Sequence, residues 1–217
     1  MRMGVETMVL RPVMRALMYI LAGYLSGSVL YARVFARLFK AGDLTELSSD
    51  RNPGTANAFR FGGFWCGALT LLCDMLKGFL PVFLYVALAR QEVADGLALA
   101  LVIAAPVIGH VLPVFYHFQG GKGIAASFGC LLGLLPHWQP AVLLAALFIF
   151  FSVVLRITPH FQRTLVTYLC APIGMLFVTD QLAVTAGFLL ISFFIVLKLL
   201  SSKEEREPMG VQILWMH

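Results

Sequence analysis

The chain carries little charge. Asp, Glu, Lys and Arg together make up 12% of its 217 residues, whereas residues of the class AVILMFWYC make up 60%. A soluble globular domain carries about 25% charged residues, and so apolar a chain lacks the polar surface to cover a soluble core. Intrinsic disorder is excluded because there is too much apolar surface to leave unburied. The composition therefore predicts an integral membrane protein with no soluble domain.

The sequence also lacks several chemical signatures. Its four cysteines, Cys66, Cys73, Cys130 and Cys170, lie in apolar segments without a CxxC pair, so we expect free thiols, no metal site and no cofactor. HExxH, GxSxG and the HxxxxD signature of better-known glycerolipid acyltransferases are missing. The net charge is +5, but no basic stretch is interleaved with aromatics for base stacking. We therefore expect membrane lipids rather than nucleic acid as partners.

Apolar runs separated by turn residues predict an all-α, polytopic bundle of about seven transmembrane helices, forming a single membrane domain over residues 1–217. The expected spans are residues 15–39, 64–88, 97–116, 124–135, 140–155, 164–178 and 182–200. The fourth is only about 18 Å long by the helical rise, which is too short to cross without help. The polar tail, residues 201–217, is expected to be peripheral.

Lysine and arginine are unevenly distributed between the expected loops. With the N-terminus outside, eleven of the 16 fall on the inner side and four on the outer side, and Lys77 lies within a span. The excess of positive charge on inner loops predicts an N-out, C-in orientation. This prediction requires an odd number of crossings.

One polar segment, residues 50–60, stands out between two apolar runs. It contains Asn52, Gly54, Asn57 and Arg60. Asn side chains and Gly backbone suit a tight turn whose N–H groups converge on an anion, and Arg adds a donor fork that fits phosphate oxygens. A solvated turn that uses Asn and Gly only for its geometry is an equally good interpretation.

A second segment, residues 120–123, places Gly120, Gly121 and Gly123 around Lys122, immediately before an apolar helix. Glycines allow a ligand to approach the backbone closely, and the helix N-terminus and the ammonium both favour an anion. The pattern is typical of a phosphate cradle, although it is not a Walker A loop. The alternative is a glycine hinge with a lysine that snorkels to the interface.

Further polar residues lie inside the expected spans. Asp74 and Lys77 are three residues apart and share a helix face, so they form either part of a polar cavity or a neutralising pair. Ser28 either reaches a ligand or bonds its own helix backbone. His110, near a helix end, is more often structural than catalytic in such a position.

Together these motifs resemble the bacterial PlsY family, the acyl-phosphate:glycerol-3-phosphate acyltransferases of the inner membrane. The resemblance covers about residues 25–133 in order and spacing. It rests on Gly27-Ser28, on Asn52-Pro53-Gly54-Thr55-Ala56-Asn57 with Arg60, on Asp74-x-x-Lys77-Gly78, on Gly109-His110-Val111-Leu112-Pro113, and on Phe118-Gln119-Gly120-Gly121-Lys122-Gly123-Ile124-Ala125.

The resemblance implies a seven-span protein of the bacterial cytoplasmic membrane with its active site at the cytoplasmic face. It implies acyl transfer from acyl phosphate to the 1-hydroxyl of sn-glycerol 3-phosphate, which gives lysophosphatidic acid for phospholipid synthesis. An acyl phosphate is already activated, so the enzyme needs to hold two anions together and orient the hydroxyl, without a metal. On this basis the catalytic candidates are Lys122, His110 and Arg60. The substrate-binding candidates are Ser28, Asn52, Gly54, Asn57, Arg60, Asp74, Lys77, Gly120, Gly121, Lys122 and Gly123.

The chain departs from the family pattern at several positions. Asp50 stands where the family has Ser, Pro159 stands at a second Ser position, and residues 198–202 lack the family's His and Asn. A carboxylate beside two phosphates is repulsive, and the adjacent Arg51 is expected to neutralise it. Two alternatives therefore stay open: a divergent paralogue whose anion pocket has altered or lost catalysis, and a small transporter of a phosphorylated solute.

Overall fold

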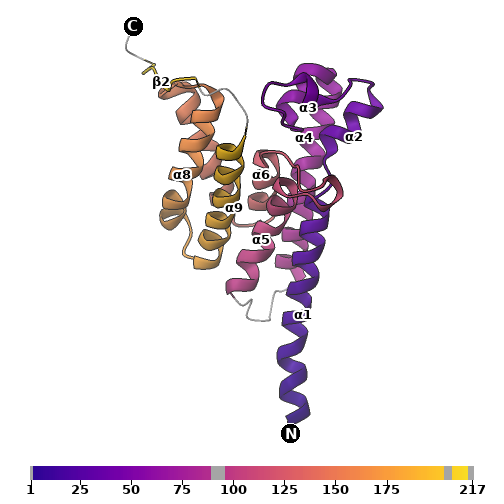
Figure 1. Cartoon of the computed structure of the whole chain (residues 1–217). Helices are drawn as coiled ribbons and strands as arrows, with labels where there is room; N and C mark the ends of the chain where they lie inside the picture. The colour runs from indigo at the N-terminus through magenta and orange to yellow at the C-terminus, as the bar shows by residue number, and fades with distance from the viewer. Residues whose placement is uncertain (1, 89–95, 203–206, 215–217) are drawn as a thin grey trace.

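The computed structural model describes residues 2–88, 96–202 and 207–214, which form a bundle of α-helices (Figure 1). The α-helices and strands are α1 (Arg2–Gly27), α2 (Tyr31–Leu38), α3 (Leu44–Leu47), α4 (Thr55–Leu88), α5 (Gly96–Val111), α6 (Ile124–Leu132), α7 (Gln139–Ile149), β1 (Ile157–Thr158), α8 (His160–Val178), α9 (Leu182–Ser201) and β2 (Gly210–Val211). A 3₁₀ turn, η1 (Val114–Tyr116), follows α5, and a π-helical turn, η2 (Phe150–Val154), follows α7.

Among the described residues, five helical segments are long and apolar enough to cross a membrane: Pro12–Leu38, Thr55–Leu88, Gly96–Tyr116, His160–Val178 and Leu182–Ser201. This confirms the all-α, polytopic membrane architecture expected from composition. The number of seven spans is not confirmed, because α6 has only nine residues and α7 only eleven. A span needs about 20 apolar residues.

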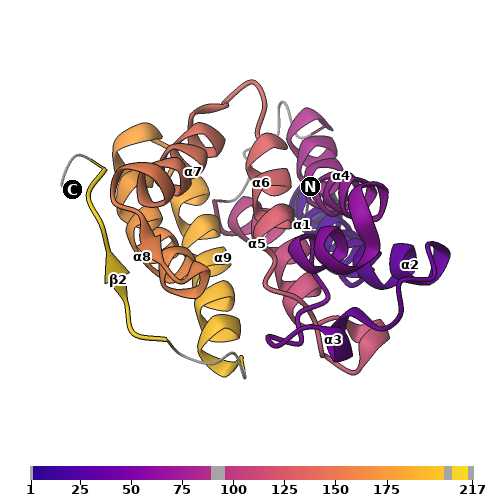
Figure 2. The same ribbon diagram turned by 90° about the horizontal axis from the view of Figure 1, so that it is seen from above.

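Helix α5 occupies the centre of the bundle. It packs against α1 on one side and α9 on the other, while α4 packs against α6. Seen from above, α5 and α6 lie between a group formed by α1 to α4 and a group formed by α7, α8 and α9 (Figure 2). This position explains why Val102, Ile103, Ala104 and Val107 on consecutive faces of α5 are all fully buried, since a helix that is apolar all round is a buried helix.

The first expected span, residues 15–39, is two helices and not one. Helix α1 ends at Gly27 and α2 begins at Tyr31, turning away from α1 at the upper end of the molecule (Figure 1). Both the backbone N–H and the hydroxyl of Ser28 donate to the carbonyl oxygen of Tyr24. The same hydroxyl accepts the N–H of Val114 from the segment after α5. The turn therefore depends on a tertiary contact that hydropathy alone does not reveal.

The second expected span, residues 64–88, lies within a longer helix that starts before it. Helix α4 starts at Thr55, and residues 55–60, which we expected in a loop, form its first turns. Gly63 interrupts α4 with φ 80° and ψ −178°, a left-handed φ that favours glycine. The predicted start at Phe64 thus coincides with the second half of α4. The remaining expected spans coincide with α5 to α9, with ends shifted by a few residues.

A small antiparallel sheet holds part of the C-terminal tail against the bundle. Ile157 pairs with Val211 and Thr158 pairs with Gly210, and the N–H of Leu214 donates to the carbonyl oxygen of Val154 at 3.0 Å. Two-residue strands give no periodic signal, so the sequence did not predict this pairing. The rest of the expected peripheral tail, residues 203–206 and 215–217, lies outside the described residues.

Helices α1 and α5 approach each other through glycines. A β-carbon added at Gly27 would collide with the carbonyl group of Pro106, and one added at Gly109 would collide with the carbonyl group of Tyr24 and come within 3.0 Å of the Ser28 nitrogen. Small residues allow such close backbone contact between helices in membranes. The contact places the end of α1 against the end of α5, where the polar motifs begin.

We predict that Gly109→Ala lowers the stability of the bundle, because the added methyl group meets backbone atoms that cannot move aside. Overpacking of this kind costs about 1–3 kcal/mol. The check is the thermal unfolding midpoint of the purified protein in detergent. Gly96→Ala on the same helix is the matched control, since its nearest neighbour is the Ala183 side chain at 3.8 Å. Equal midpoints for the two variants would contradict the packing argument.

Candidate active site

The segment before α4 forms a compact loop held by Asn57. The Nδ2 group of Asn57 donates to the Asn52 carbonyl oxygen and to Oδ1 of Asp50, both at 2.8 Å. The Asn52 N–H also donates to Oδ1 of Asp50 at 3.2 Å. Arg51 between them has a positive φ of 47°, which turns the chain sharply. The loop thus fixes one oxygen of the Asp50 carboxylate and leaves the other to face outward.

The glycine-rich segment before α6 packs directly against this loop. The N–H of Lys122 donates to Oδ1 of Asn52 at 3.1 Å, and the N–H of Gly121 donates to the His110 carbonyl oxygen at 3.1 Å. A β-carbon at Gly121 would lie 3.1 Å from Asn52 Oδ1 and collide with the His110 ring, and one at Gly120 would collide with the His110 carbonyl oxygen. Gly123 has φ 81° and precedes the first residue of α6. The predicted position of Lys122 at a helix N-terminus is confirmed.

Lys122 and Asp50 form an ion pair between the two loops. The Lys122 ammonium lies 3.0 Å from Oδ2 of Asp50, and both side chains are largely buried. The expectation that Arg51 neutralises Asp50 is wrong: the carboxylate points toward Lys122, while Arg51 is exposed. Because the backbone turns sharply at Arg51, the side chains of Asp50 and Arg51 point in different directions. The two neighbours in sequence therefore do not form an ion pair with each other.

The pKa of Asp50 is held below its usual value. Burial of the carboxyl raises the pKa, but the Lys122 ammonium and the hydrogen bonds from Asn57 and the Asn52 backbone together outweigh it. Because the pKa is lower in the folded protein, the carboxylate stabilises the fold above the unfolded-state pKa of about 3.9. That contribution is lost as the pH falls through the lowered value. At neutral pH the Asp50 carboxyl is therefore ionised.

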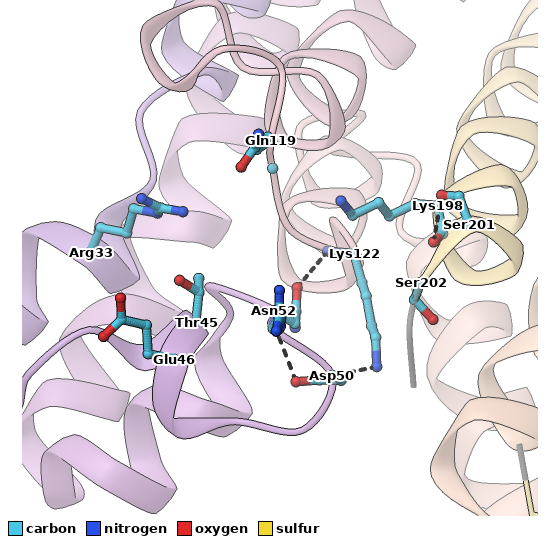
Figure 3. A pocket seen from close by; sticks show the side chains of 12 residues that line it. Arg33, Thr45, Glu46, Asp50, Asn52, Gln119, Lys122, Lys198, Ser201 and Ser202 are labelled. Carbon is cyan, nitrogen blue, oxygen red and sulfur yellow. Dashed lines mark hydrogen bonds and ion pairs between the residues drawn. The ribbon is translucent and has the colours of Figure 1, made fainter. Parts of the chain in front are cut away.

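Two cavities adjoin at this ion pair. The polar cavity, of about 670 Å³, is lined by Arg33, Thr45, Glu46, Asp50, Arg51, Asn52, Gln119, Gly120, Lys122, Lys198, Ser201 and Ser202. Lys198 extends toward it from α9, and Arg33 reaches it from the α2 side (Figure 3). The apolar cavity, of about 340 Å³, is lined by Asp50, Asn52, Gly54, Thr55, Ala56, Leu71, Asp74, His110, Lys122, Gly123, Ile124, Ala125, Phe128 and His160.

A buried charge cluster lies beneath the glycine-rich loop. The Lys77 ammonium lies 2.7 Å from Asp74 Oδ1, 2.7 Å from the Val29 carbonyl oxygen and 2.7 Å from His110 Nδ1. An ammonium has no lone pair, so His110 accepts through Nδ1 and carries its proton on Nε2. Asp74, Lys77 and His110 are each at most 3% exposed. Asp74 and Lys77 share a helix face, as predicted, and they form an ion pair there.

The structure brings most of the predicted site residues together. The two loops bring together Asn52, Lys122 and the glycines at 54, 120, 121 and 123, and Asn57 of α4 is bound to the first loop. Asp74 and His110 line the apolar cavity. Ser28 and Lys77 are occupied by protein partners and line neither of the two cavities. Arg60 is exposed on α4, with its guanidinium 5.3 Å from the Phe61 ring centroid, and also lies outside both linings.

Several residues of the polar cavity were not singled out from the sequence. Lys198, Ser201 and Ser202 come from the end of α9, and Arg33 comes from α2. The sequence offered one signal, since residues 198–202 replace a family stretch expected to bind substrate. Within the described ranges, no group of three or more His, Cys, Asp or Glu side chains is placed to hold a metal ion.

We predict that Asp74→Asn destabilises the bundle, because it leaves the Lys77 ammonium buried without its carboxylate. Breaking a buried ion pair from one side costs about 3–5 kcal/mol. The thermal unfolding midpoint in detergent measures the loss, with the exposed Asp180→Asn as control. Replacing both charges by Asp74→Leu with Lys77→Met should recover part of the loss. If Asp74→Asn alone were as stable as the natural protein, the Asp74–Lys77 pair would not be what holds the helices together.

Comparison with known proteins connects this architecture to one family. The profile of the glycerol-3-phosphate acyltransferase family matches residues 17–205. A glycerol-3-phosphate acyltransferase from Shewanella woodyi is 34% identical over 170 residues, which cover 78% of this chain and 80% of the relative. One from Legionella pneumophila (strain Corby) is 42% identical over 127 residues, or 58% of this chain. The chain spans less than half of that relative's length, 43%.

A solved structure has a similar fold. The crystal structure of PlsY, described as an integral membrane glycerol 3-phosphate acyltransferase in its glycerol 3-phosphate form, superposes with a TM-score of 0.70. It is 27% identical in sequence, and the match covers 84% of this chain and 87% of PlsY. The structure of its lysophosphatidic acid form superposes with a TM-score of 0.66. The extent of the family match, together with the ordered polar motifs on this fold, establishes that the chain belongs to the glycerol-3-phosphate acyltransferase family.

Proposed function

We propose that this protein transfers an acyl group from acyl phosphate to the 1-hydroxyl of sn-glycerol 3-phosphate, forming lysophosphatidic acid and phosphate. The observation that carries the proposal is the position of Lys122, whose ammonium stands where a cation-lined polar cavity adjoins an apolar cavity. The named activity of the relatives and the substrate and product forms of the PlsY structures support it.

The two cavities suit the two substrates. Arg33, Arg51, Lys122 and Lys198 give the polar cavity four cations against the two carboxylates of Glu46 and Asp50, which favours a glycerol phosphate dianion. The apolar cavity, bordered by Leu71, Ile124 and Phe128, suits the start of an acyl chain. The acyl phosphate would then place its phosphate at Lys122, between the two.

Such an arrangement needs no enzyme nucleophile. An acyl phosphate is a mixed anhydride, so the protein accelerates the reaction by binding the two anions side by side and by stabilising the departing phosphate. Lys122 supplies the charge for that phosphate, and the glycines let it approach the backbone. His110 positions the loop through its carbonyl bond to Gly121. Arg60 stays a proposed phosphate ligand on the sequence pattern alone, since its exposed side chain lies outside the lining of both cavities.

The test of the proposal is an assay of the purified protein with palmitoyl phosphate and glycerol 3-phosphate, with lysophosphatidate as the product measured. We expect product with the acyl phosphate and far less with palmitoyl-CoA, since no motif suggests a pocket for coenzyme A. Failure to form lysophosphatidate from palmitoyl phosphate would refute the proposal. It would favour the alternative of a divergent paralogue, for which the Asp50–Lys122 ion pair across the anion site is the motivating observation.

We predict that Lys122→Ala lowers turnover by about 30-fold to several thousand-fold, because a phosphate is left without its charged partner. Truncating one side of a buried charge pair costs about 2–5 kcal/mol. Transition-state theory gives the fold-change, since each increase of about 1.4 kcal/mol in the barrier slows the rate tenfold. Lys122→Arg should restore only part of the activity, because the planar guanidinium needs more room than the tightly packed loop offers. Steady-state kinetics on variants of matched thermal stability provide the measurement.

Lys40→Ala serves as the control for this prediction, because Lys40 is exposed at the same end of the bundle and lines neither cavity. Its turnover should match that of the natural protein. If Lys122→Ala retained more than about half of the activity, the role of this loop as a phosphate cradle would be excluded.

We infer further that the protein forms one domain in the bacterial cytoplasmic membrane, with its site at the cytoplasmic face. The cavities are lined from α2, from the loops before α4 and α6, from the start of α8 and from the end of α9. Nine of the described Lys and Arg residues lie in or next to these segments: Arg33, Arg37, Lys40, Arg51, Arg60, Lys122, Arg156, Arg163 and Lys198. At the opposite end Arg15 donates to the Leu88 carbonyl oxygen. Positive charge concentrates on the cytoplasmic side of membrane proteins.

We predict that Ser49→Cys, exposed beside the polar cavity, reacts with a membrane-impermeant maleimide only after cells are permeabilised. Asp180→Cys, exposed between α8 and α9 at the other end, should react in intact cells. The described native cysteines are all at least partly buried, which keeps the background low. The reverse labelling pattern would show that the bundle is inserted the other way.

A further inference from the structure

Arg33 of α2 is a cation of the polar cavity that has no carboxylate partner. It lies across this cavity from Lys198 and Ser202 (Figure 3). Between the described residues, every ion pair involves Asp50 or Asp74, and none includes Arg33. Its Nε is buried and has no hydrogen-bond partner. Because a buried donor without a partner is costly, the stability of the fold alone does not account for this arginine.

The nearby carboxylates do not cancel the charge of Arg33. Asp43 accepts the Thr45 N–H at 2.8 Å and the Thr45 hydroxyl at 2.7 Å. These hydrogen bonds lower the pKa of Asp43, and the charges of Arg33 and Arg37 lower it further. Two arginines therefore share one carboxylate that already has hydrogen-bond partners. Glu46 lines the same cavity as Arg33, but the two form no ion pair within the described ranges.

An aromatic ring holds the Arg33 side chain in place. Its guanidinium carbon lies 5.4 Å from the centroid of the Tyr116 ring in η1. The turn that precedes α2 is bound to the start of η1 by the hydrogen bond from the Val114 N–H to the Ser28 hydroxyl. One tertiary contact thus positions both partners. A guanidinium over a ring gains cation–π attraction through its face, so the N–H donors at its edge stay available for an anion.

The two cavities distinguish the anions that can reach Arg33. Lys122 borders both cavities, whereas Arg33 borders only the polar one. An acyl phosphate with its chain in the apolar cavity therefore has its phosphate at Lys122. A water-soluble phosphate monoester lies wholly in the polar cavity, which Arg33 lines. Arg51 also lines this cavity, but its side chain is exposed, and water weakens the attraction of an exposed charge.

We propose that Arg33 binds the phosphate of the glycerol 3-phosphate acceptor, while Lys122 holds the phosphate of the donor. This inference rests on the proposed function for the identity of both substrates. The planar guanidinium fits two phosphate oxygens at once. Separate cations keep the two phosphates apart, which reduces their mutual repulsion. Glu46, a carboxylate on the same lining, is then suited to accept a hydrogen bond from a glycerol hydroxyl.

The experiment measures binding of glycerol 3-phosphate to the purified protein by isothermal titration calorimetry, and the KM of each substrate by a steady-state assay. We expect Arg33→Gln to weaken binding of glycerol 3-phosphate, and to raise its KM, by about 10-fold to 100-fold, the range for a lost charge-assisted hydrogen bond. The KM for palmitoyl phosphate should not change, nor should kcat at saturating glycerol 3-phosphate. Arg33→Lys should recover part of the affinity, since it keeps the charge without the planar fork.

Arg37→Gln is the matched control, because it removes the same charge from the next turn of the same helix. Arg37 is exposed on α2 and lines neither the polar nor the apolar cavity. The KM of this variant for glycerol 3-phosphate should equal that of the natural protein. Thermal unfolding midpoints show whether each variant is folded. If Arg33→Gln is unstable, Arg33→Met, which keeps an unbranched side chain, takes its place.

The outcomes distinguish the two levels of inference. A natural protein that binds glycerol 3-phosphate but forms no lysophosphatidate overturns the proposed function, and the binding data still decide the role of Arg33. A natural protein that does neither overturns both. If Arg33→Gln binds glycerol 3-phosphate as tightly as the natural protein, only the role of Arg33 is overturned. An equal rise in the KM of both substrates also overturns it, because that result indicates a structural fault. A loss confined to glycerol 3-phosphate supports it.

Discussion

The cost of placing charge inside an apolar bundle shapes this protein. Lys77 is buried in α4, so its ammonium must be matched by Asp74 and by hydrogen-bond acceptors. Those acceptors are the Val29 carbonyl oxygen after α1 and the His110 ring on α5. One cation thereby ties three segments together. His110 also fixes the glycine-rich loop, because its carbonyl oxygen accepts the N–H of Gly121, the residue before Lys122. A continuous set of contacts leads from the buried ion pair to the loop at the cavities.

Close backbone approach is the second requirement. The end of α1 meets α5 at Gly27 and Gly109, and α6 meets α4 at Gly78 and Gly129, where an added β-carbon would collide with backbone carbonyl groups. Within the bundle, α6 is therefore held tightly although it is too short to cross a membrane unaided. Its N-terminus, which follows Gly123, is fixed at the level of the cavities. The short helix positions Lys122 because its neighbours leave it no freedom to tilt.

Sequence patterns predicted the parts of the fold that depend on local chemistry. The glycines around Lys122 indicated a loop that opens a helix, and the three-residue spacing of Asp74 and Lys77 indicated a shared face; both are confirmed. The turn after Gly27 was not predictable from hydropathy, because the hydrogen bond from Val114 to Ser28 that holds it comes from a distant segment. Helical structure from Thr55 onward was missed because Asn and Gly favour turns when read locally.

Partner choice was the least predictable feature of the site. Adjacency suggested that Arg51 would neutralise Asp50, but the backbone turn directs the carboxylate to Lys122, seventy-two positions away in sequence. The sequence marked Lys198 as one of the charges that set the orientation and as part of a stretch that departs from the family. It did not place Lys198 at the polar cavity, since that depends on how α9 packs against α5. Long-range pairs of this kind follow from the assembled bundle, whereas each loop alone leaves several partners open.

The departures from the family pattern compensate one another within the polar cavity. Asp50 brings a negative charge to a position where the family has Ser, and residues 198–202 lack the family's His and Asn. The same stretch, however, brings Lys198 into the cavity with the hydroxyls of Ser201 and Ser202. With Arg33, Arg51 and Lys122 the lining keeps four cations against Asp50 and Glu46, a formal excess of two positive charges. An excess of that size would match the phosphate dianion proposed as its ligand. The added carboxylate therefore leaves the lining net positive while it pairs with Lys122.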